Sequence, residues 1–385
     1  MRTRLLLLFI LFFNLPARAQ VTALKSRELK GYIKDLQSVS FLDNPDSVTT
    51  ASLIHNRINF RWNATEKLYA RIEIRNRIYY GEQVERTPGF GKYIDTDEGY
   101  FKLGKLWVDR KSVVAHSELD RAMIGFADEK FSIVAGRQRI NWGINSLWNP
   151  NDLFNAYNFL DFDYEERPGT DGLRLQYFLT PSTSLEAAYK PSKKTDQSVA
   201  ALLFKMNKWK YDFQFLGGVY NSDLVAGAGW AGNLKDAGFK GEISFFTPKN
   251  AILKKRASWT AASSMDYSFQ NNLYSTIGLL YQSEPLVSGP GNAPFLNSEL
   301  SAKNLMPYKF SFFASIVKQF TPLLTGNFTA IYSPTQNSTI LFPSISYNLS
   351  QSFDLDLAIQ SFFREVSGTY RTISNSAFLR MRYSF

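Results

Sequence analysis

The sequence predicts an all-β fold, a transmembrane antiparallel up-and-down β-barrel of about 18 strands. The first observation is the carboxy-terminal segment, where apolar and polar residues alternate: Leu379, Met381, Tyr383 and Phe385 against Arg380, Arg382 and Ser384. One face of this strand suits lipid, and the other carries arginines that a wet lumen accommodates. An aromatic final residue is typical of the closing strand of a bacterial outer-membrane barrel. A soluble protein ending in an amphipathic strand is the alternative.

The second observation is an amino-terminal segment with the parts of a secretory signal peptide. Met1 to Arg4 carries two arginines, Leu5 to Leu15 is a short apolar run, and Ala17-Arg18-Ala19 fits a cleavage site. The run is too short for a membrane anchor. We therefore expect residues 1–19 to be a signal peptide and residues 20–385 to form one outer-membrane barrel.

Composition is the third observation. The chain is 15% aromatic yet has no further run of the about 20 apolar residues that a transmembrane helix needs. A barrel reconciles these facts, because its lipid-facing residues occur singly at alternate positions. The absence of cysteine excludes disulfide and thiol chemistry. The net charge of +10 does not indicate nucleic-acid binding, since the arginines alternate with apolar residues and do not cluster.

Turn residues divide the chain into amphipathic strands joined alternately by short turns and longer connections. The short turns fall near 63–65, 127–129, 180–182, 207–208, 232–233, 270–271, 321–322 and 349–350. The longer connections fall near 42–48, 81–116, 142–170, 191–196, 221–223, 248–256, 285–304, 334–338 and 365–371. The count reaches about 18 only if Leu29 to Phe41 is the first strand, and 16 is the alternative. A barrel of this size leaves a water-filled passage unless something plugs it.

Alternation also assigns the faces of the strands. Isoleucines alternate with charged residues along 70–79, and the strand before it repeats the pattern along 54–62. The side chains expected to line the lumen are Arg57, Arg61, Arg71, Glu73, Arg75, Arg77, Arg137, Arg174, Asp354, Asp356, Arg380 and Arg382. Closure would make the last strand a neighbour of the first, which gathers these arginines into one basic wall.

The charges of this wall suggest a selectivity role. Glu73, Asp354 and Asp356 interrupt it, so opposed charges across the lumen would set up a transverse field, and the arginine excess would favour anions. The alternative is that the inward charges form ion-pair ladders that fill the lumen and have no part in transport.

The most distinctive motif runs from Gly136 to Gly143, with the sequence GRQRINWG, and Leu119-Asp120-Arg121 precedes it. It is followed by Trp148-Asn149-Pro150-Asn151-Asp152 and then by RPGTDG at 167–172. Over residues 119–175 the chain resembles a group of porin-like outer-membrane barrels. The nearest members of this group are alginate-export-type barrels and related uncharacterised families. The resemblance implies passive or substrate-selective passage across the outer membrane, but no substrate-binding residue carries over, so alginate is not predicted.

The same motif predicts a constriction loop with Trp142, Trp148, Asn149 and Asp152. Trp142 would belong to an interfacial aromatic girdle, and Asn149 with Pro150 would cap a short helix. The loop either folds into the pore and narrows it or packs over the rim. An acidic cluster at 161–166 could bind calcium, but pairing with Arg167 is the favoured interpretation.

Enzymatic activity is not expected, and neither is a cofactor or a metal. The chain has two histidines, His55 and His116, and neither completes a catalytic constellation. We expect a monomeric or trimeric porin-like channel for small polar solutes, preferentially anionic ones. The alternatives are a structural or partner-docking barrel of a secretion or export apparatus, and a channel for hydrophobic compounds, suggested by Tyr79 and Phe178. The expected partners are membrane lipid and lipopolysaccharide, and the barrel-assembly machinery through Phe385.

Overall fold

The structure is a computed structural model that describes residues 26–42, 48–97, 99–155, 169–250, 256–285 and 300–385. The predicted signal peptide at 1–19 and the acidic cluster at 161–166 lie outside these residues. Within the described residues, no helix has the length and apolarity that a membrane crossing requires.

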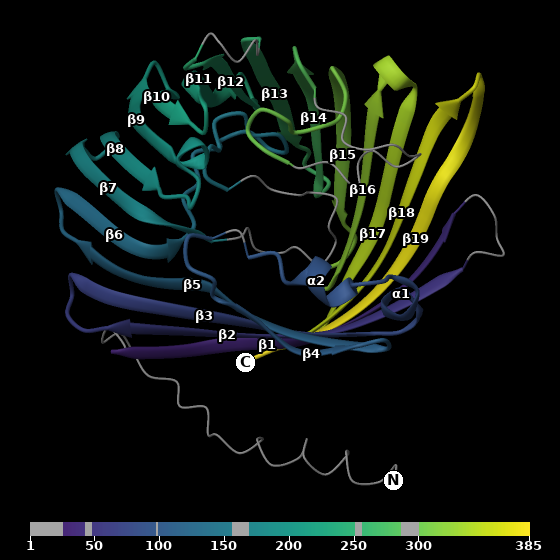
Figure 1. Cartoon of the computed structure of the whole chain (residues 1–385). Coiled ribbons are helices and arrows are strands. Elements are labelled where there is room, and N and C mark those ends of the chain that lie inside the picture. Colours follow the sequence, from purple (N-terminus) through teal and green to yellow (C-terminus); the bar gives the residue numbers. More distant parts are fainter. Residues whose placement is uncertain (1–25, 43–47, 98, 156–168, 251–255, 286–299) are drawn as a thin grey trace.

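Nineteen strands account for most of the described chain (Figure 1). They are β1 (Arg27–Leu42), β2 (Thr49–Asn63), β3 (Leu68–Tyr80), β4 (Gly104–Arg110), β5 (Val113–Ala127), β6 (Phe131–Gln138), β7 (Thr170–Thr180), β8 (Thr183–Lys190), β9 (Val199–Lys208), β10 (Tyr211–Tyr220), β11 (Asp223–Leu234), β12 (Ala237–Pro248), β13 (Ser258–Ser268), β14 (Leu273–Gln282), β15 (Phe310–Gln319), β16 (Leu324–Ser333), β17 (Ser338–Ser350), β18 (Phe353–Val366) and β19 (Thr369–Ser384). The helices are short: α1 (Glu82–Arg86), α2 (Phe90–Ile94), and the 3-10 turns η1 (Thr195–Gln197) and η3 (Pro334–Gln336).

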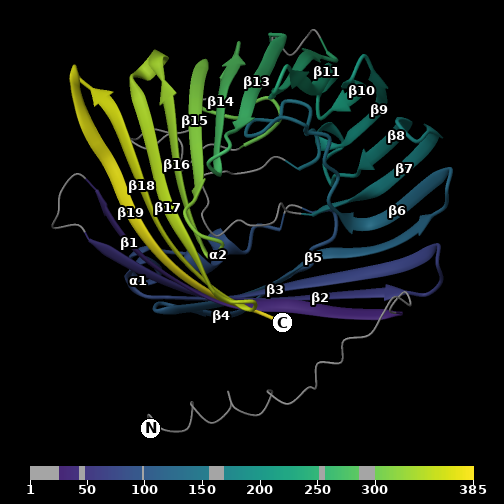
Figure 2. The same ribbon diagram turned by 180° about the vertical axis from the view of Figure 1, so that it is seen from behind.

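Eighteen of the strands close into an antiparallel barrel, as the sequence predicts (Figures 1 and 2). Closure occurs at β1, which pairs with β2 on one side and with β19 on the other. Phe385 completes the seam, because its backbone N–H and C=O both bond to Gly31 at 2.9 Å. The irregular segment Leu29 to Phe41 is therefore a wall strand, and the count of 18 is confirmed.

The remaining strand, β4, lies within the connection between β3 and β5. It pairs with β5 only, beside residues 113–118, where β6 does not reach. The expected single loop at 81–116 is wrong, because this connection contains α1, α2 and β4. Val84 of α1 and Phe90 of α2 pack against Val114 of β5, so this connection is ordered by a small apolar cluster of its own.

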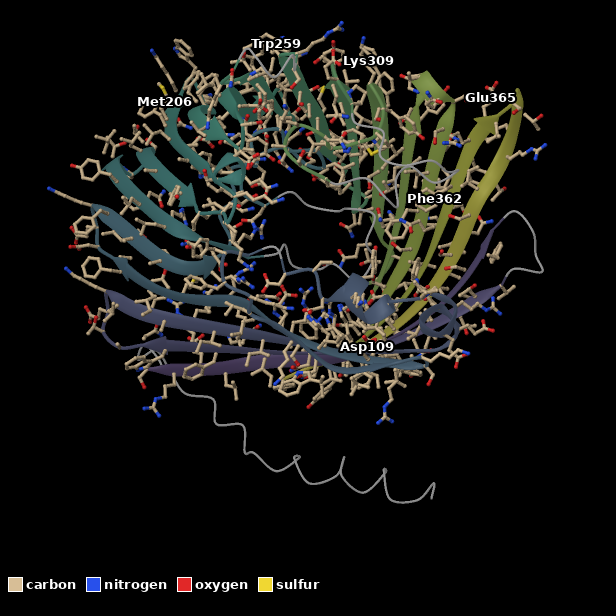
Figure 3. The ribbon with its side chains drawn as sticks, in the orientation of Figure 1. Asp109, Met206, Trp259, Lys309, Phe362 and Glu365 are labelled. Carbon is tan, nitrogen blue, oxygen red and sulfur yellow. The ribbon has the colours of Figure 1, made fainter. Side chains whose placement is uncertain are left out.

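The faces of the wall strands follow the predicted alternation. Isoleucines such as Ile54, Ile72 and Ile78 are exposed on the outside, while Arg57 and Glu73 between them are buried inside. Large apolar side chains lie on the outer surface of the wall, and Trp259 is one of them (Figure 3). Because hydrocarbon cannot hydrogen-bond exposed backbone, a closed barrel with an apolar exterior is a form in which strands can span a bilayer.

Candidate functional site

The predicted inward charges of β18 and β19 pair with each other across neighbouring strands. Arg380 lies beside Asp356 and Arg382 beside Asp354 in the register, with closest contacts of 2.9 Å and 2.6 Å. Both acids therefore interrupt the arginine wall, as expected, and they neutralise the arginines next to them on the same wall. These pairs fit the ion-pair-ladder alternative, and they do not set up a field across the lumen.

Arg57 of β2 is the centre of a larger buried group. Its guanidinium donates to Glu73 of β3 at 2.6 Å and to Asp120 of β5 at 2.5 Å, and the residue is 2% exposed. Three neighbouring strands are thus joined by charge-assisted hydrogen bonds, which are about twice as strong as neutral ones.

The arginines of β3 extend this group. Arg75 contacts Glu118 at 2.9 Å and Asp120 at 3.0 Å, and Arg77 lies 3.9 Å from Glu118. Arg71 is 3.7 Å from Glu73 and its side chain is 36% exposed, so it presents more of its charge to solvent. Arg61 donates to Asn63 and lies over the ring of Tyr69. We call the charged groups of β18, β19, β2, β3 and β5 the ion-pair ladder.

The motif of the sequence analysis forms one end of this ladder. A bulge in β5 at Asp120 turns both Asp120 and Arg121 into the barrel, where they are buried. On β6, Gly136 has φ +112, and a Cβ there would come within 2.2 Å of the carbonyl oxygen of Ala122. Glycine is required at this position because other residues avoid this conformation and would collide with β5.

Arg137 is buried between carboxylates and does not face an open passage. Its guanidinium donates to both oxygens of Asp171 at 2.8 Å and 3.0 Å, and to Asp97 at 3.0 Å. Burial would raise the pKa of the Asp97 carboxyl, but hydrogen bonds from Arg137 and from the backbone of Gly99 and Leu103 hold that pKa below its usual value. Arg137 therefore ties the connection before β4 to the wall.

The loop after β6 folds into the barrel. Its described part, residues 139–155, is called the inward loop, and it follows the inner wall past β8, β10, β11 and β12 as far as β13. Arg174 of β7 lies at its start, paired with Glu186 of β8 at 2.8 Å. Of the two alternatives that the sequence left open, the described part of the loop follows the first, because it lies inside the barrel.

A single carboxylate anchors the middle of the inward loop. Glu242 of β12 accepts backbone N–H groups from Ile144 at 2.5 Å, Asn145 at 2.7 Å and Asn151 at 2.8 Å. The neighbouring Ser244 donates to the carbonyl oxygen of Pro150 at 3.0 Å. Buried backbone donors need such acceptors, so Glu242 fixes the path of the loop.

Two expectations for this loop are wrong. Trp142 is 1% exposed inside the barrel, where it packs edge-on against Phe154 and donates to Glu186, so it does not belong to an interfacial girdle. Residues 149–152 form a turn and not a helix start, with the N–H of Asp152 bonded to the carbonyl oxygen of Asn149. Trp148, Asn149 and Asp152 are buried with it, as parts of the loop's packing.

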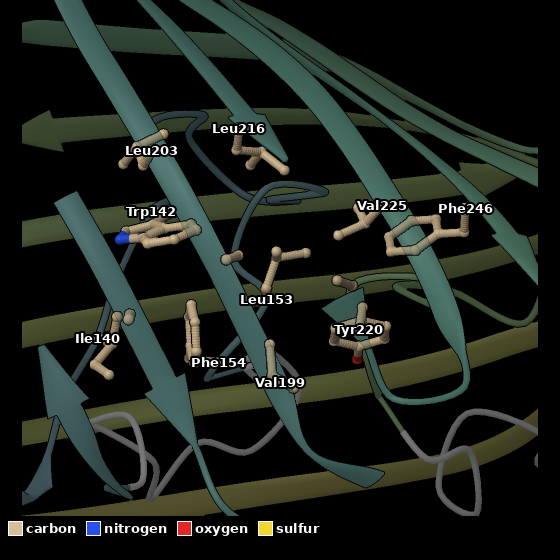
Figure 4. Close-up of a cluster of buried hydrophobic side chains, with 13 residues drawn as sticks. Ile140, Trp142, Leu153, Phe154, Val199, Leu203, Leu216, Tyr220, Val225 and Phe246 are labelled. Carbon is tan, nitrogen blue, oxygen red and sulfur yellow. The ribbon is translucent and has the colours of Figure 1, made fainter. Parts of the chain in front are cut away.

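Apolar packing holds the inward loop against the wall (Figure 4). Trp142, Leu153 and Phe154 of the loop join side chains from the inner faces of β9 to β12: Val199, Leu203, Leu216, Tyr220, Val225 and Phe246. These wall positions would otherwise face water, so the loop buries apolar surface that the barrel itself cannot cover.

A second segment, residues 300–308, lies against the same half of the wall. Gln282 of β14 accepts the N–H of Leu305 at 2.7 Å and donates to the carbonyl oxygens of Met306 and Tyr308. Trp148 of the inward loop packs in the same cluster as Leu305 and Met306. The two segments therefore support each other.

The lumen thus has two unlike sides. Ion pairs occupy inner positions from β18 through closure to β7, whereas the packed loops and their apolar clusters cover the inner face from β8 to β15 and extend to buried residues of β16 to β19. Glu242 and Gln282 were not predicted. A lone inward glutamate between Gly241 and Ile243 was the available signal, because a strand does not carry a buried carboxylate without a partner.

Neither histidine forms part of a catalytic arrangement among the described residues. His55 packs against Tyr32 with ring centroids 5.4 Å apart, and His116 contacts Asp95 at 3.3 Å. In the described part of the chain, no three metal-binding side chains gather at one point.

The fold is similar to that of solved outer-membrane proteins from pseudomonads. The outer membrane protein OprD from Pseudomonas aeruginosa matches with a TM-score of 0.61 and 11% identity, over 94% of this chain and 93% of that one. A BenF-like porin from Pseudomonas fluorescens Pf-5 gives 0.59 and 10%, over 94% and 100%. OccK5 (OpdH) from P. aeruginosa gives 0.60 and 8%, over 94% and 99%.

At these identities the likeness establishes the fold, that of a porin-type outer-membrane barrel. No family model and no curated protein matches the sequence. The broad expectation of a porin-like barrel is supported, whereas the narrower resemblance to alginate-export-type barrels stays a prediction.

Proposed function

We propose that this protein is an outer-membrane channel through which small polar solutes diffuse, with a preference for anions. The observation that carries the proposal is the division of the lumen into a charged side and a loop-packed side. A solute crossing the barrel would pass between them, in contact with the ion-pair ladder.

The anion preference rests on the ladder's geometry and no longer on a bare excess of arginine. Most of its arginines are paired, but Arg71 and Arg61 are partly exposed, and their contacts with the described residues are long or neutral ones. A narrow water-filled passage with low-dielectric walls concentrates the field of such charges. Lumen charges of this kind set the ion selectivity of channels.

Single-channel recording tests the proposal directly. The refolded protein, placed in a planar bilayer under a salt gradient, should give steady openings with a reversal potential on the anion-selective side. Resistance to unfolding in SDS before heating would show that the barrel is folded. A folded barrel that conducts no current would contradict the channel and favour a structural barrel.

The arginines of β3 provide the first prediction. Replacing Arg71, Arg75 and Arg77 together with serine should move the reversal potential toward cation selectivity, because Glu118 would lose both of its β3 partners. The matched control is Arg110→Ser, Lys111→Ser and Arg371→Ser, which removes the same charge from exposed positions. An equal shift in both variants would mean that overall charge, and not the ladder, sets the selectivity.

The broader resemblance and the expected partners remain part of this proposal. The motif around Gly136 is consistent with relatives among alginate-export-type barrels, without implying that polysaccharide. We also expect contact with lipopolysaccharide around the outer rim and recognition of the closing strand by the barrel-assembly machinery through Phe385.

A further inference from the structure

Part of the lipid-facing surface is polar. Asp35 and Gln37 of β1, Ser52 and Asn56 of β2, Asn76 of β3 and Ser117 of β5 form what we call the outer polar patch. The register places them outside: Asp35 pairs with Ile54 and Met381, and Gln37 pairs with Leu379, all three exposed apolar residues.

The outer polar patch lies within the apolar belt and not at its rim. Along β2, Asn56 stands between Ile54 and Ile58, and along β3, Asn76 stands between Ile74 and Ile78. Ile54 and Ile78 are both exposed to the surroundings of the barrel. Hydrocarbon offers no hydrogen bonds, so polar groups at this position are costly unless they are partnered.

The hydrogen bonds of the patch run from strand to strand. Ser117 donates to Asn76 at 2.6 Å, and Asn76 donates to Asn56 at 3.0 Å. Beside them, Ser52 donates to Gln37 at 2.6 Å and Gln37 donates to Asp35 at 2.8 Å. Asn56 also donates to the backbone carbonyl oxygen of Tyr32 at 3.1 Å. Because an amide has two N–H donors and a carbonyl with two lone pairs, Asn56 and Asn76 each retain one N–H and one lone pair beyond these bonds.

Asp35 is the residue of the outer polar patch with the greatest need for a partner outside the barrel. In the described residues its carboxylate accepts a hydrogen bond from Gln37 and takes part in no ion pair. A carboxylate on a lipid-facing strand requires a donor or a cation from outside the barrel.

We propose that the outer polar patch binds a second copy of this chain within the membrane, around a two-fold axis along the membrane normal. The Asn56–Asn76 pair would lie at the axis, where amides can pair with the same amides of the other copy. A two-fold contact uses the same surface on both partners, and a patch rich in amides is complementary to itself.

The charges at the two flanks agree with this arrangement. Asp35 lies on the β1 flank, and Lys105 lies on the β4 flank, paired with Ser117 in the register and stacked on the ring of Trp107 at 4.2 Å. A two-fold axis between the flanks exchanges them, so the acidic flank of one copy would face the basic flank of the other. Two copies in the same membrane orientation satisfy this condition.

The absence of cysteine allows a direct test. A single Asn56→Cys variant, reconstituted in vesicles and oxidised, should form a covalent dimer in several-fold excess over an Ile277→Cys control. Ile277 is an outward-facing residue of β14, 58% exposed, on a part of the barrel away from the patch. The excess should persist when the vesicles are diluted with lipid, whereas random collisions would decline.

Removal of the patch should have the opposite effect. Asn56→Leu with Asn76→Leu should lower the dimer fraction counted by single-molecule photobleaching, and Ser263→Leu with Ser275→Leu, also facing outward, should not. Equal cross-linking at positions 56 and 277 would overturn the proposal. Cross-linking in cells to a product of another mass, without a dimer in vesicles, would also overturn it and would assign the patch to a different protein. Channel conductance is measured separately, so the outcome does not depend on the transport proposal.

Discussion

Replacing Glu242 with leucine is expected to convert steady single-channel currents into currents interrupted by frequent closures. The substitution removes the acceptor of the N–H groups of Ile144, Asn145 and Asn151, and each buried donor left unsatisfied costs about 1–3 kcal/mol. The middle of the inward loop would then leave the wall and enter the lumen. The measurement is the open-state dwell time in planar bilayers at constant voltage.

The control for this experiment keeps the shape of the side chain. Glu242→Gln retains one carbonyl oxygen as an acceptor, so its dwell times should lie between those of the leucine variant and the native protein. A second control is Ser275→Leu on the outer face, which should leave the current unchanged. Steady currents from a folded Glu242→Leu protein would show that apolar packing alone holds the loop.

Replacing Arg57 with methionine is expected to destabilise the barrel more than any other single change in the ladder. Glu73 and Asp120 would remain buried without the guanidinium between them, and breaking a buried ion pair in this way costs about 3–5 kcal/mol. The midpoint of urea unfolding in detergent, followed by tryptophan fluorescence, should fall markedly.

A second substitution distinguishes the loss of the Arg57 ion pairs from the loss of the packing of its side chain. Adding Asp120→Asn to Arg57→Met should restore part of the midpoint, because one of the unpaired charges disappears. Arg61→Met, which removes a partly exposed guanidinium bonded to Asn63, should have a small effect. If the single and double variants unfold at the same urea concentration, the charges do not carry the stability.

Much of the wall could be predicted from the sequence because strand geometry is strictly periodic. A period of two placed Arg71 and Ile72 on opposite faces, and the structure agrees. The pairing of Asp354 with Arg382 could have been read from hairpin geometry, since the two strands are sequential neighbours. Alternation alone left open whether these acids pair with their neighbours or act across the lumen, because it gives the face of a residue and not its partner.

The lumen contents were harder to predict because loops have no period. Trp142 is equally plausible in a girdle or in a core by composition, and only the path of the inward loop decides that it packs with Phe154. Asn149 and Pro150 are good helix starters locally, but Glu242 and Ser244 take the backbone groups of this segment and impose a turn. Tertiary contacts override such local preferences.

The pairing of β1 with β19 closes the sheet into a ring of strands. The start of β1 and the end of β19 meet at one rim, at Gly31 and Phe385, and each wall strand has two hydrogen-bonded neighbours. A circular permutant would keep the same strand neighbours. Its chain would join the present termini and would begin and end at another turn, such as 221–222 between β10 and β11. The linear order of the strands is therefore a property of synthesis, and the finished wall retains no first strand.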